Sequence, residues 1–308
     1  MLRPARSADI DIQDPHREPD FAPRVEETAS GAFLPGTRIE VMREPVGRGG
    51  YRHVLFDFDG TLSLVREGWP EVMVGMMVEL LLATPRHESE EELTPRVREF
   101  VAELTGKQTI YQMIRLTEEV AARGGTPEDP LTYKRLYHDR LMARIDSRRQ
   151  ALRSGAASPD QMLVPGSRAL LEHLAGRGLA LYLASGTDEH YVREEAALLR
   201  LADFFGPRIY GAQDDYRGFS KAKVIARLLE LNRVEGAALL GFGDGYVEID
   251  NIKAVGGTAV GVASNESDPG GPPDPWKRER LLRVGADLLI ADYREHAALL
   301  DCLFPQAG

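Results

Sequence analysis

The sequence predicts an α/β fold in which a parallel sheet, covered by helices on both faces, carries a large helical insert. Three features predict it: an apolar run typical of a buried strand, a long block of helical periodicity, and an alternation of strands and helices after Pro165. Such alternation implies right-handed crossovers between parallel strands. The expected parts are a polar tail (1–37), a core (38–66 and 164–308) and a helical insert (67–163).

The first segment, residues 1 to about 35, is rich in Pro, Asp, Glu and Arg and lacks periodicity, which predicts a loose tail or an extended wrap. Residues 38–44 (RIEVMRE) alternate weakly before the turn sequence GRGG, which predicts an added edge strand. The run VLFDFDGTLS at 54–63 predicts a buried strand that ends in two carboxylates. Because an unpaired charge is costly there, Asp57 and Asp59 are expected to be functional.

The insert is expected to form four helices, because each of its segments has apolar residues at spacings of three and four, and glycines separate the segments. The expected helices are WPEVMVGMMVELLLAT (69–84), SEEELTPRVREFVAELTG (89–106), KQTIYQMIRLTEEVAARGG (107–125) and LTYKRLYHDRLMARIDSRRQALRSG (131–155).

The second half of the core alternates amphipathic helices with short apolar strands. The expected helices are 166–178, 190–205, 220–232, 276–286 and a final helix near the C-terminus. The expected strands are LALYLASG (179–186), RIYGAQ (208–213), AALLGFGDG (237–245), TAVGVAS (258–264) and DLLIAD (287–292).

Polar residues follow three of the expected strands, in the sequences FDFDGT, ASGTDE and GDGYVE. A fourth sequence, FSKAKVI, brings a lysine to the start of a helix. Ligands of open α/β sheets bind beyond the carboxyl ends of the strands, so we expect the four sequences to meet in one crevice. There, Asp57 and Asp244, with Glu248 beside the latter, form an oxygen-rich cluster of the type that binds Mg²⁺.

The same residues predict a chemistry. Asp57 is placed to act as a carboxylate nucleophile, and Asp59 as a general acid and base. The hydroxyl and amide groups of three further residues are expected to hold phosphoryl oxygens, and a lysine offsets negative charge at the same centre. The three are Thr61, Ser185 and Gly186, and the lysine is Lys221.

The ordered set DFDGT, ASG, SKAKVI and GDGYVE resembles the four motifs of the haloacid dehalogenase-like (HAD) hydrolase superfamily. The resemblance covers about residues 51–66 and 164–294, and the insert lies where the family places its C1 cap. It implies a Rossmann-like core with the HAD fold. It also implies a Mg²⁺-dependent phosphatase that works through an aspartyl-phosphate.

Carried over to this chain, the resemblance implies that Asp57 is the nucleophile and Asp59 the acid and base. Ser185 would contact phosphate, and Lys221 would steady the nucleophile and the phosphate. The implied Mg²⁺ ligands are Asp57, the main-chain carbonyl of Asp59, Asp244 and, directly or through water, Glu248, with Asp250 as a weaker candidate.

Two assignments stay open within the motifs. Lys221 and Lys223 both fall in the third motif, and Lys221 is favoured because it begins the helix; the other would be an exposed helix lysine. Ser185 is a phosphate contact or the N-cap of the following helix, and both roles are compatible because helix N-termini bind phosphate.

The substrate is expected to be a small phosphorylated metabolite, a sugar phosphate or a nucleoside monophosphate. In the family the cap closes over the core site and contacts the leaving group. The sequence TGKQTIYQ at 105–112 is the candidate contact loop, with Lys107 as its charged group, and an ordinary helix start is the alternative. Arg66 and Trp69, just after the nucleophile loop, would reach the substrate or form the hinge.

Three other activities share these motifs or this fold. A phosphomutase of the β-phosphoglucomutase kind would use the same residues, and a phosphonatase would need a cap lysine, for which Lys107 is available. A dehalogenase is disfavoured, because such chemistry does not require the leaving-group acid that Asp59 provides. A binding module that keeps the fold without catalysis is disfavoured, because all the expected functional groups are present.

The amino-acid composition limits the binding partners and the cellular location that can be expected for the protein. The formal charge of −10 argues against general nucleic-acid binding, which needs a basic surface. The single cysteine, Cys302, excludes an internal disulfide and fits a reducing compartment. The sequence shows neither an apolar run of membrane-spanning length nor a signal core. A cytoplasmic protein without membrane partners is therefore expected, and its oligomeric state is left open.

Overall fold

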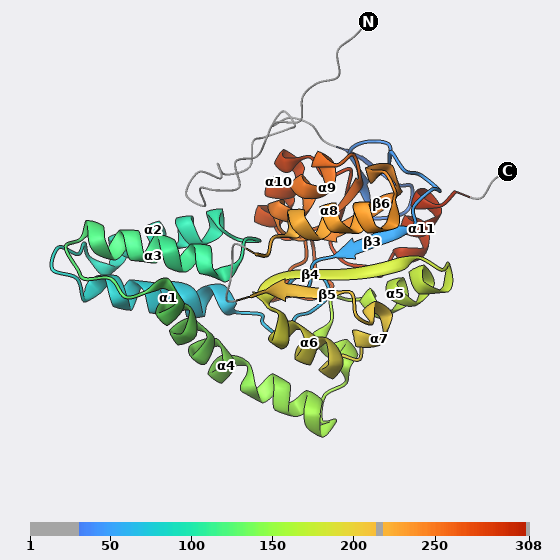
Figure 1. Cartoon of the computed structure of the whole chain (residues 1–308). Helices are drawn as coiled ribbons and strands as arrows, with labels where there is room; N and C mark the ends of the chain where they lie inside the picture. Colours follow the sequence, from blue (N-terminus) through green and yellow to red (C-terminus); the bar gives the residue numbers. More distant parts are fainter. Residues whose placement is uncertain (1–30, 214–217, 306–308) are drawn as a thin grey trace, which may run out of the picture.

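The computed structural model describes residues 31–213 and 218–305, which form a sheet flanked by helices and a projecting helical insert (Figure 1). The sheet of these residues has eight strands in the order β1-β2-β8-β7-β6-β3-β4-β5. Strands β3 to β8 pair in parallel, whereas β2 pairs antiparallel with β8 and β1 with β2. The strands are β1 (Ala32–Phe33), β2 (Glu40–Val41), β3 (His53–Phe56), β4 (Ala180–Asp188), β5 (Ile209–Ala212), β6 (Leu239–Gly243), β7 (Thr258–Val262) and β8 (Leu288–Ile290).

The predicted edge strand is confirmed, because β2 extends the sheet beyond β8. Most of the predicted N-terminal tail, residues 1–30, lies outside the described residues. Its described end contributes β1, in which Phe33 pairs with Glu40, so the sheet begins before residue 38. The side chain of Glu40 holds this edge against the core, because it accepts two hydrogen bonds from Arg278 at 3.0 and 2.7 Å.

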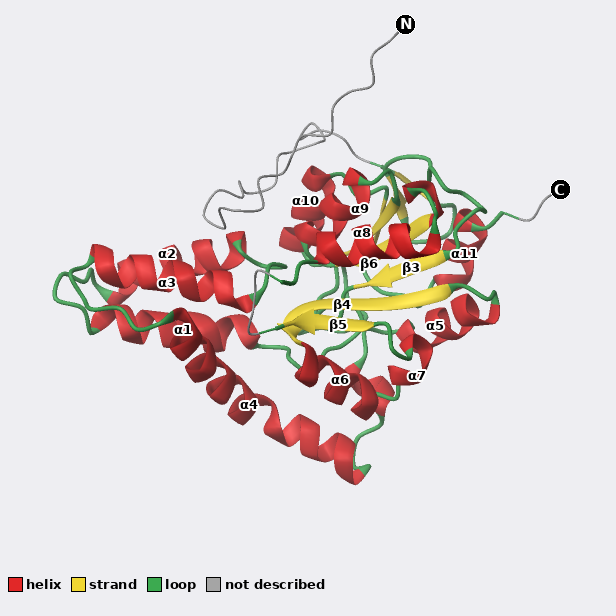
Figure 2. Cartoon of the chain, viewed as in Figure 1, coloured by secondary structure: helices red, strands yellow, loops and turns green. Residues whose placement is uncertain are grey.

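Helices cover both faces of the sheet (Figure 2). The buried side chains of β3 alternate between two apolar clusters: Val54 and Phe56 belong to one, and Leu55 belongs to the other. The first cluster also contains residues of α5 (Ser167–Gly176), α6 (Glu189–Leu198), α7 (Ala202–Phe205) and α11 (His296–Leu303). The second contains residues of α8 (Lys221–Asn232), α9 (Tyr246–Ala254) and α10 (Pro275–Val284).

The insert forms the four helices that its periodicity predicts, and it projects to one side of the sheet (Figure 1). Local signals set their ends. Ser89 makes a capping box with Glu92 at the start of the second helix, and Asp129 caps the fourth, which ends at Gly155 in the left-handed region (φ 75°). The helices are α1 (Trp69–Leu82), α2 (Glu90–Glu103), α3 (Thr109–Ala122) and α4 (Pro130–Ser154).

Two predicted elements differ from the structure. The helix expected over 190–205 is divided into α6 and α7 by Arg200, which has a φ of 56°. Leu199 and Leu201 are both fully buried, and two residues that are two positions apart in one helix cannot face the same core. The strand expected to end at Gly186 continues to Asp188, where its register with β5 shifts.

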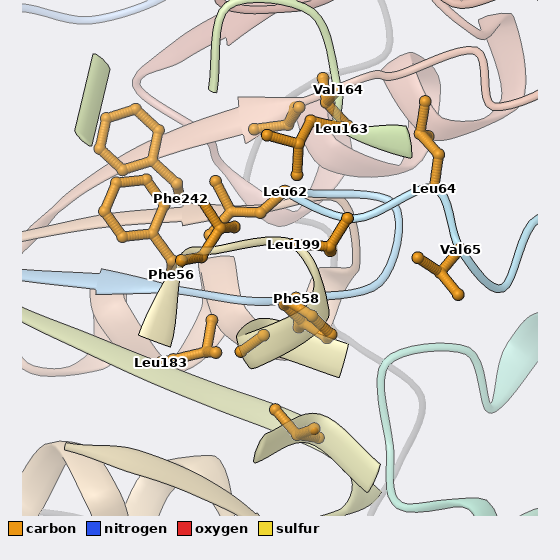
Figure 3. Packing of buried hydrophobic residues seen from close by; sticks show 14 of the residues in the cluster. Phe56, Phe58, Leu62, Leu64, Val65, Leu163, Val164, Leu183, Leu199 and Phe242 are labelled. Atoms are coloured by element: carbon orange, nitrogen blue, oxygen red, sulfur yellow. The ribbon is translucent and has the colours of Figure 1, made fainter. Parts of the chain in front are cut away.

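The chain enters and leaves the insert side by side. The amide of Leu64 donates to the carbonyl of Met162 at 2.9 Å, and the amide of Val164 donates to the carbonyl of Leu62 at 3.0 Å. Leu62, Leu163 and Val164 belong to the same apolar cluster as Phe56 and Phe242, whose rings stack with centroids 4.7 Å apart (Figure 3). The hinge of the insert therefore rests on the same apolar cluster as the central strand.

No helix in the described ranges is both long and apolar enough to cross a membrane.

A matched pair of leucine variants tests the placement of the core. Leu240 is fully buried on β6, whereas Leu231 on α8 is 69% exposed. We expect Leu240→Ala to lower the free energy of unfolding by about 2–5 kcal/mol, because it removes buried methyl groups and leaves a cavity. Leu231→Ala should change it by no more than about 0.5 kcal/mol. Urea unfolding of both variants measures the difference, and equal losses would contradict this assignment of the core.

Candidate active site

A cavity of about 730 Å³ lies at the carboxyl ends of β3, β4 and β6, between the sheet and the insert. The pairing of the three strands explains its place. Phe56 is in register with both Leu183 and Phe242, so the residues that follow these three positions come close together at one edge of the sheet. The core side chains that line the cavity include Asp57, Asp59, Ser185, Lys221, Asp244 and Lys277.

Asp57 is the first residue after β3, and its amide donates to the carbonyl of Phe242 at 2.9 Å. Its side chain is buried, and Oδ1 accepts a hydrogen bond from Nζ of Lys221 at 2.8 Å. Burial raises the pKa of Asp57; the Lys221 ammonium opposes this rise and the Asp244 carboxylate adds to it.

Lys221 is the first residue of α8, and Ser220 caps that helix by accepting a hydrogen bond from the amide of Lys223 at 3.1 Å. The side chain of Lys221 is buried in the site, whereas Lys223 is exposed and does not line the cavity. The structure therefore brings the first lysine of the motif to the site, as favoured from the sequence.

Asp59 lies two residues beyond Asp57, and Gly60 turns the chain with a φ of 72°; a Cβ there would collide with the carboxylate of Asp244. Oδ2 of Asp59 accepts a hydrogen bond from the Thr187 hydroxyl at 2.9 Å, and Oδ1 lies 3.7 Å from Nε of Arg66. Burial raises the pKa of Asp59 to about 7 despite this guanidinium. A carboxyl group with such a pKa can donate and accept protons near neutral pH.

A buried glutamate fixes the side chain of Arg66. Its Nε and Nη2 each donate to the carboxylate of Glu195 at 2.9 Å, and both side chains are buried. This forked pair fixes the guanidinium beside Asp59. Arg66 and Trp69 both line the cavity, so their two predicted roles, in substrate contact or in the hinge, stay predictions.

Asp244 follows β6 and is held by two partners. Its Oδ1 accepts a hydrogen bond from the Thr61 hydroxyl at 3.1 Å, and its Oδ2 lies 2.8 Å from Nζ of Lys277. The Thr61 hydroxyl also accepts a hydrogen bond from the Asp244 amide at 3.0 Å, and the Thr61 amide donates to Phe58. Thr61 is fully buried, does not line the cavity, and holds the Asp244 loop through its polar groups, so its role as a phosphate contact stays a prediction.

Glu248 on α9 does not line the cavity. Its Oε1 forms an ion pair with Lys221, and the side chain is only 1% exposed. Oε2 has no hydrogen-bond partner among the described residues. The structure thus places Glu248 behind Lys221 as a second counter-ion, rather than beside Asp57 and Asp244 as predicted. Asp250, the weaker candidate, is also outside the set of residues that line the cavity.

The donor set fits a single Mg²⁺. The described residues contain no group of three or more His, Cys, Asp or Glu side chains arranged to hold a metal ion. Mg²⁺, however, keeps several waters and needs only one or two protein carboxylates together with substrate phosphate. Asp57 and Asp244 both line the cavity, and their mutual repulsion contributes to the raised pKa of Asp57, so a cation between them would be stabilised.

Ser185 and Gly186 continue β4 into the cavity wall. The Ser185 hydroxyl accepts a hydrogen bond from the Thr187 amide at 3.1 Å and lies 3.5 Å from Oδ2 of Asp59. The helix that follows begins only at Glu189, with Asp188 at the N-cap position, so the alternative prediction that Ser185 caps it is wrong.

The insert touches the core at the loop before α3. A Cβ on Gly186 would lie 2.6 Å from the carbonyl oxygen of Lys107, so this close approach needs glycine. The side-chain amide of Gln108 donates to the carbonyl of Phe219 at 2.9 Å, and Arg280 donates to the carbonyl of Glu103 at 2.8 Å. The loop is therefore both a helix start and a wall of the cavity, which Lys107 lines.

Several residues of the site were not predicted from the sequence: Thr187, Glu195, Ser264, Glu266 and Lys277. Lys277 carried one detectable signal. It lies in the first turn of α10, where a cation opposes the helix dipole, so its position calls for a partner outside the helix. Glu195 and Glu266 carried no comparable signal, because a glutamate in a helix or a polar loop is ordinary.

Solved structures share this fold at low sequence identity. A predicted phosphoglycolate phosphatase from Haemophilus somnus has a TM-score of 0.53 and 14% identity, covering 81% of this chain and 98% of that one. A predicted phosphatase from Clostridium acetobutylicum has a TM-score of 0.53 and 18% identity, covering 82% and 99%. A β-phosphoglucomutase from Clostridium difficile has a TM-score of 0.55 and 15% identity, covering 82% and 97%.

A search of curated proteins finds no match. The sequence profile of the haloacid dehalogenase-like hydrolases matches residues 51–256, which include β3 to β6, the whole insert and all four predicted motifs. With the fold and the profile in agreement, this chain belongs to the haloacid dehalogenase-like hydrolases.

Proposed function

We propose that the protein is a Mg²⁺-dependent phosphatase that hydrolyses a small phosphorylated metabolite through an aspartyl-phosphate. One observation carries the proposal. A buried carboxylate, Asp57, is held by the ammonium of Lys221 in the same cavity as a second carboxyl group, Asp59, whose pKa is raised to about 7. The first is arranged as a nucleophile and the second as a proton donor and acceptor.

The reaction follows in two steps. A carboxylate oxygen of Asp57 attacks phosphorus, the bond from phosphorus to the leaving oxygen breaks, and Asp59 donates its proton to that oxygen. In the second step Asp59, now a carboxylate, takes a proton from water as the water attacks the phosphoryl group. The acyl-phosphate bond breaks, inorganic phosphate leaves, and both aspartates return to their starting states.

The cavity supplies partners for the phosphoryl oxygens. Lys221, Ser185 and Gly186 line it on the core side. Fixed donors of this kind stabilise the charge that develops in the transition state. Asp57, the carbonyl of Asp59 and Asp244 would hold Mg²⁺, which neutralises phosphoryl charge when bound.

The helices of the insert are proposed to act as a C1-type cap spanning about residues 67–163. They line one side of the cavity, and the chain enters and leaves the insert side by side, as a hinge requires. Because the cavity of about 730 Å³ includes both charged and polar groups, it suits a sugar phosphate or a nucleoside monophosphate.

A phosphomutase is the second candidate, because the β-phosphoglucomutase from Clostridium difficile shares the fold. The two activities differ in the acceptor of the phosphoryl group, which is water in one and a sugar hydroxyl in the other. Product analysis separates them, since only a phosphatase releases inorganic phosphate in proportion to the substrate consumed.

The first test is phosphate release from a panel of sugar phosphates, nucleoside monophosphates and an aryl phosphate, with Mg²⁺ and with EDTA. We expect Mg²⁺-dependent release from the wild-type protein and none from Asp57→Asn, because the amide is not a nucleophile. Asp160→Asn is the matched control, since Asp160 is an exposed aspartate that pairs with Arg168. Normal turnover by folded Asp57→Asn would contradict the mechanism.

Asp59→Asn tests the acid and base. With an aryl phosphate, whose leaving group needs no proton, the first step should proceed while breakdown of the phosphoenzyme slows by about 10²–10⁴-fold. Intact-protein mass spectrometry after an acid quench should show the phosphorylated protein accumulating. The double variant Asp57→Asn with Asp59→Asn should show no adduct, and an adduct there would place the nucleophile elsewhere.

Lys107→Ala tests the contact loop of the insert. We expect the KM for the best substrate of the panel to rise about tenfold, as for loss of one charged hydrogen bond, with a smaller rise for the aryl phosphate. Lys223→Ala, which removes an exposed lysine outside this cavity, should leave both KM values unchanged. Equal effects of Lys107→Ala on the two KM values would show that the loop has a purely structural role.

A further inference from the structure

The cavity contains a lysine that the proposed reaction does not use. Nζ of Lys277 lies 2.8 Å from Oδ2 of Asp244 and 2.8 Å from Oε1 of Glu266, and it donates to the Ser264 hydroxyl at 3.1 Å. The side chain is only 11% exposed, yet it lines the cavity together with both acids. An ammonium group therefore lies on one of the two carboxylates that would bind Mg²⁺.

The local structure directs Lys277 into this position. The helix α10 begins at Pro275, and Asp274 caps it by accepting a hydrogen bond from the Lys277 amide at 2.8 Å. A cation in the first turn of a helix is unfavourable, so the Lys277 side chain is stabilised here by the two acids that it contacts. The Ser264 hydroxyl donates in turn to the carbonyl of Gly60, which ties the lysine to the loop after Asp57.

Both oxygens of the Asp244 carboxylate are engaged, one by Thr61 and the other by Lys277. A divalent cation bound by Asp244 must share Oδ2 with the ammonium or displace it. Like charges at such short range repel strongly where water is largely excluded, so the lysine opposes cation binding. Without a divalent cation, the same lysine partly compensates two carboxylates that would otherwise lie in the cavity without a cation.

We propose that Lys277 is a positioning residue that serves as the resident counter-cation of Asp244: it holds this carboxylate in the metal-free protein and weakens Mg²⁺ binding by competing for Oδ2. The inference rests on the proposed function, since Mg²⁺ at Asp244 is part of it. On release from Asp244, the lysine retains Glu266 as a partner, so the exchange leaves no isolated charge.

A purely structural ion pair makes the opposite prediction. If Lys277 only braced the wall of the cavity, its loss would leave Asp244 less well placed, and Mg²⁺ affinity would stay the same or fall. Competition requires that affinity rise. The sign of the change therefore separates the two roles.

The test is Mg²⁺ titration calorimetry on the full-length wild-type protein and Lys277→Met, together with thermal melting in EDTA and in Mg²⁺. We expect Lys277→Met to bind Mg²⁺ about tenfold tighter or more, because one positive charge near the ion is lost. Its melting temperature should fall in EDTA and recover with Mg²⁺, giving a larger Mg²⁺-induced shift than in the wild type.

Lys253→Met is the matched control. Lys253 forms a comparable pair with Asp287, with Nζ at 2.7 and 2.9 Å from the two oxygens, and it does not line the cavity. Its loss should lower the melting temperature equally with and without Mg²⁺ and leave the affinity at the wild-type value. A tenfold gain in this variant as well would show a general charge effect and overturn the inference.

The double variant Lys277→Met with Glu266→Gln keeps the test decisive if the single variant does not fold. It removes one positive and one negative charge, so the net charge of the cavity wall is unchanged while Asp244 is released. Mg²⁺ should still bind more tightly than to the wild type. If the wild type binds Mg²⁺ and neither variant binds it more tightly, the inference about Lys277 is wrong while the proposed function stands. If the wild type binds no Mg²⁺, both the inference and the proposed metal role are wrong.

Discussion

The site depends on the parallel pairing of β3 with β4 on one side and β6 on the other. Because Phe56 is in register with Leu183 and Phe242, the residues that follow these three positions, among them Asp57, Ser185 and Asp244, lie at the same edge of the sheet. β3 is only four residues long and buried on both faces, so its register is specified by the two apolar clusters that its alternating side chains enter. A shift by one residue would turn Phe56 to the wrong face and move Asp57 out of line with Asp244.

Burial of three aspartates in one cavity is tolerated because each lies against a cation that also binds a glutamate. The sets are Asp57 with Lys221 and Glu248, Asp59 with Arg66 and Glu195, and Asp244 with Lys277 and Glu266. In each set the glutamate fixes the cation, and the cation stabilises the aspartate without leaving a bare charge. When its aspartate is ionised, each set carries one net negative charge, which suits the divalent cation of the proposed reaction; protonation of Asp59, whose pKa is about 7, makes its set neutral.

The insert is fastened to the core in two places with different character. Its long helix α4 is tied to α6 by ion pairs, because Arg149 and Arg153 both reach Glu194 at 2.5 Å, and Lys134 pairs with Asp188 at the start of α6. At the loop before α3 the carbonyl of Lys107 lies against Gly186, and the side chains of Gln108 and Arg280 donate hydrogen bonds to backbone carbonyls. None of these contacts uses the side chain of Lys107, so they hold the loop at the cavity independently of that side chain.

The sequence by itself determined the elements and the principal acids. Periodicity predicted the four helices of the insert, since apolar faces must recur with the helical repeat, and apolar runs predicted β3, β4 and β6. Asp57, Asp59 and Asp244 were identified because each follows a buried strand, where an unpaired charge is energetically costly. The first lysine of the third motif was favoured over Lys223 because it begins its helix.

Only the tertiary structure decided which polar groups meet. Thr61 holds the Asp244 loop instead of facing the cavity, and Glu248 lies behind Lys221, because the sharp turn at Gly60 and the start of α9 direct both side chains inward. Lys277 reaches Asp244 across the sheet edge from a helix that begins 31 residues later in the chain. Ion pairs between distant residues leave no periodic trace in a sequence, since their geometry exists only once the strands and helices have packed.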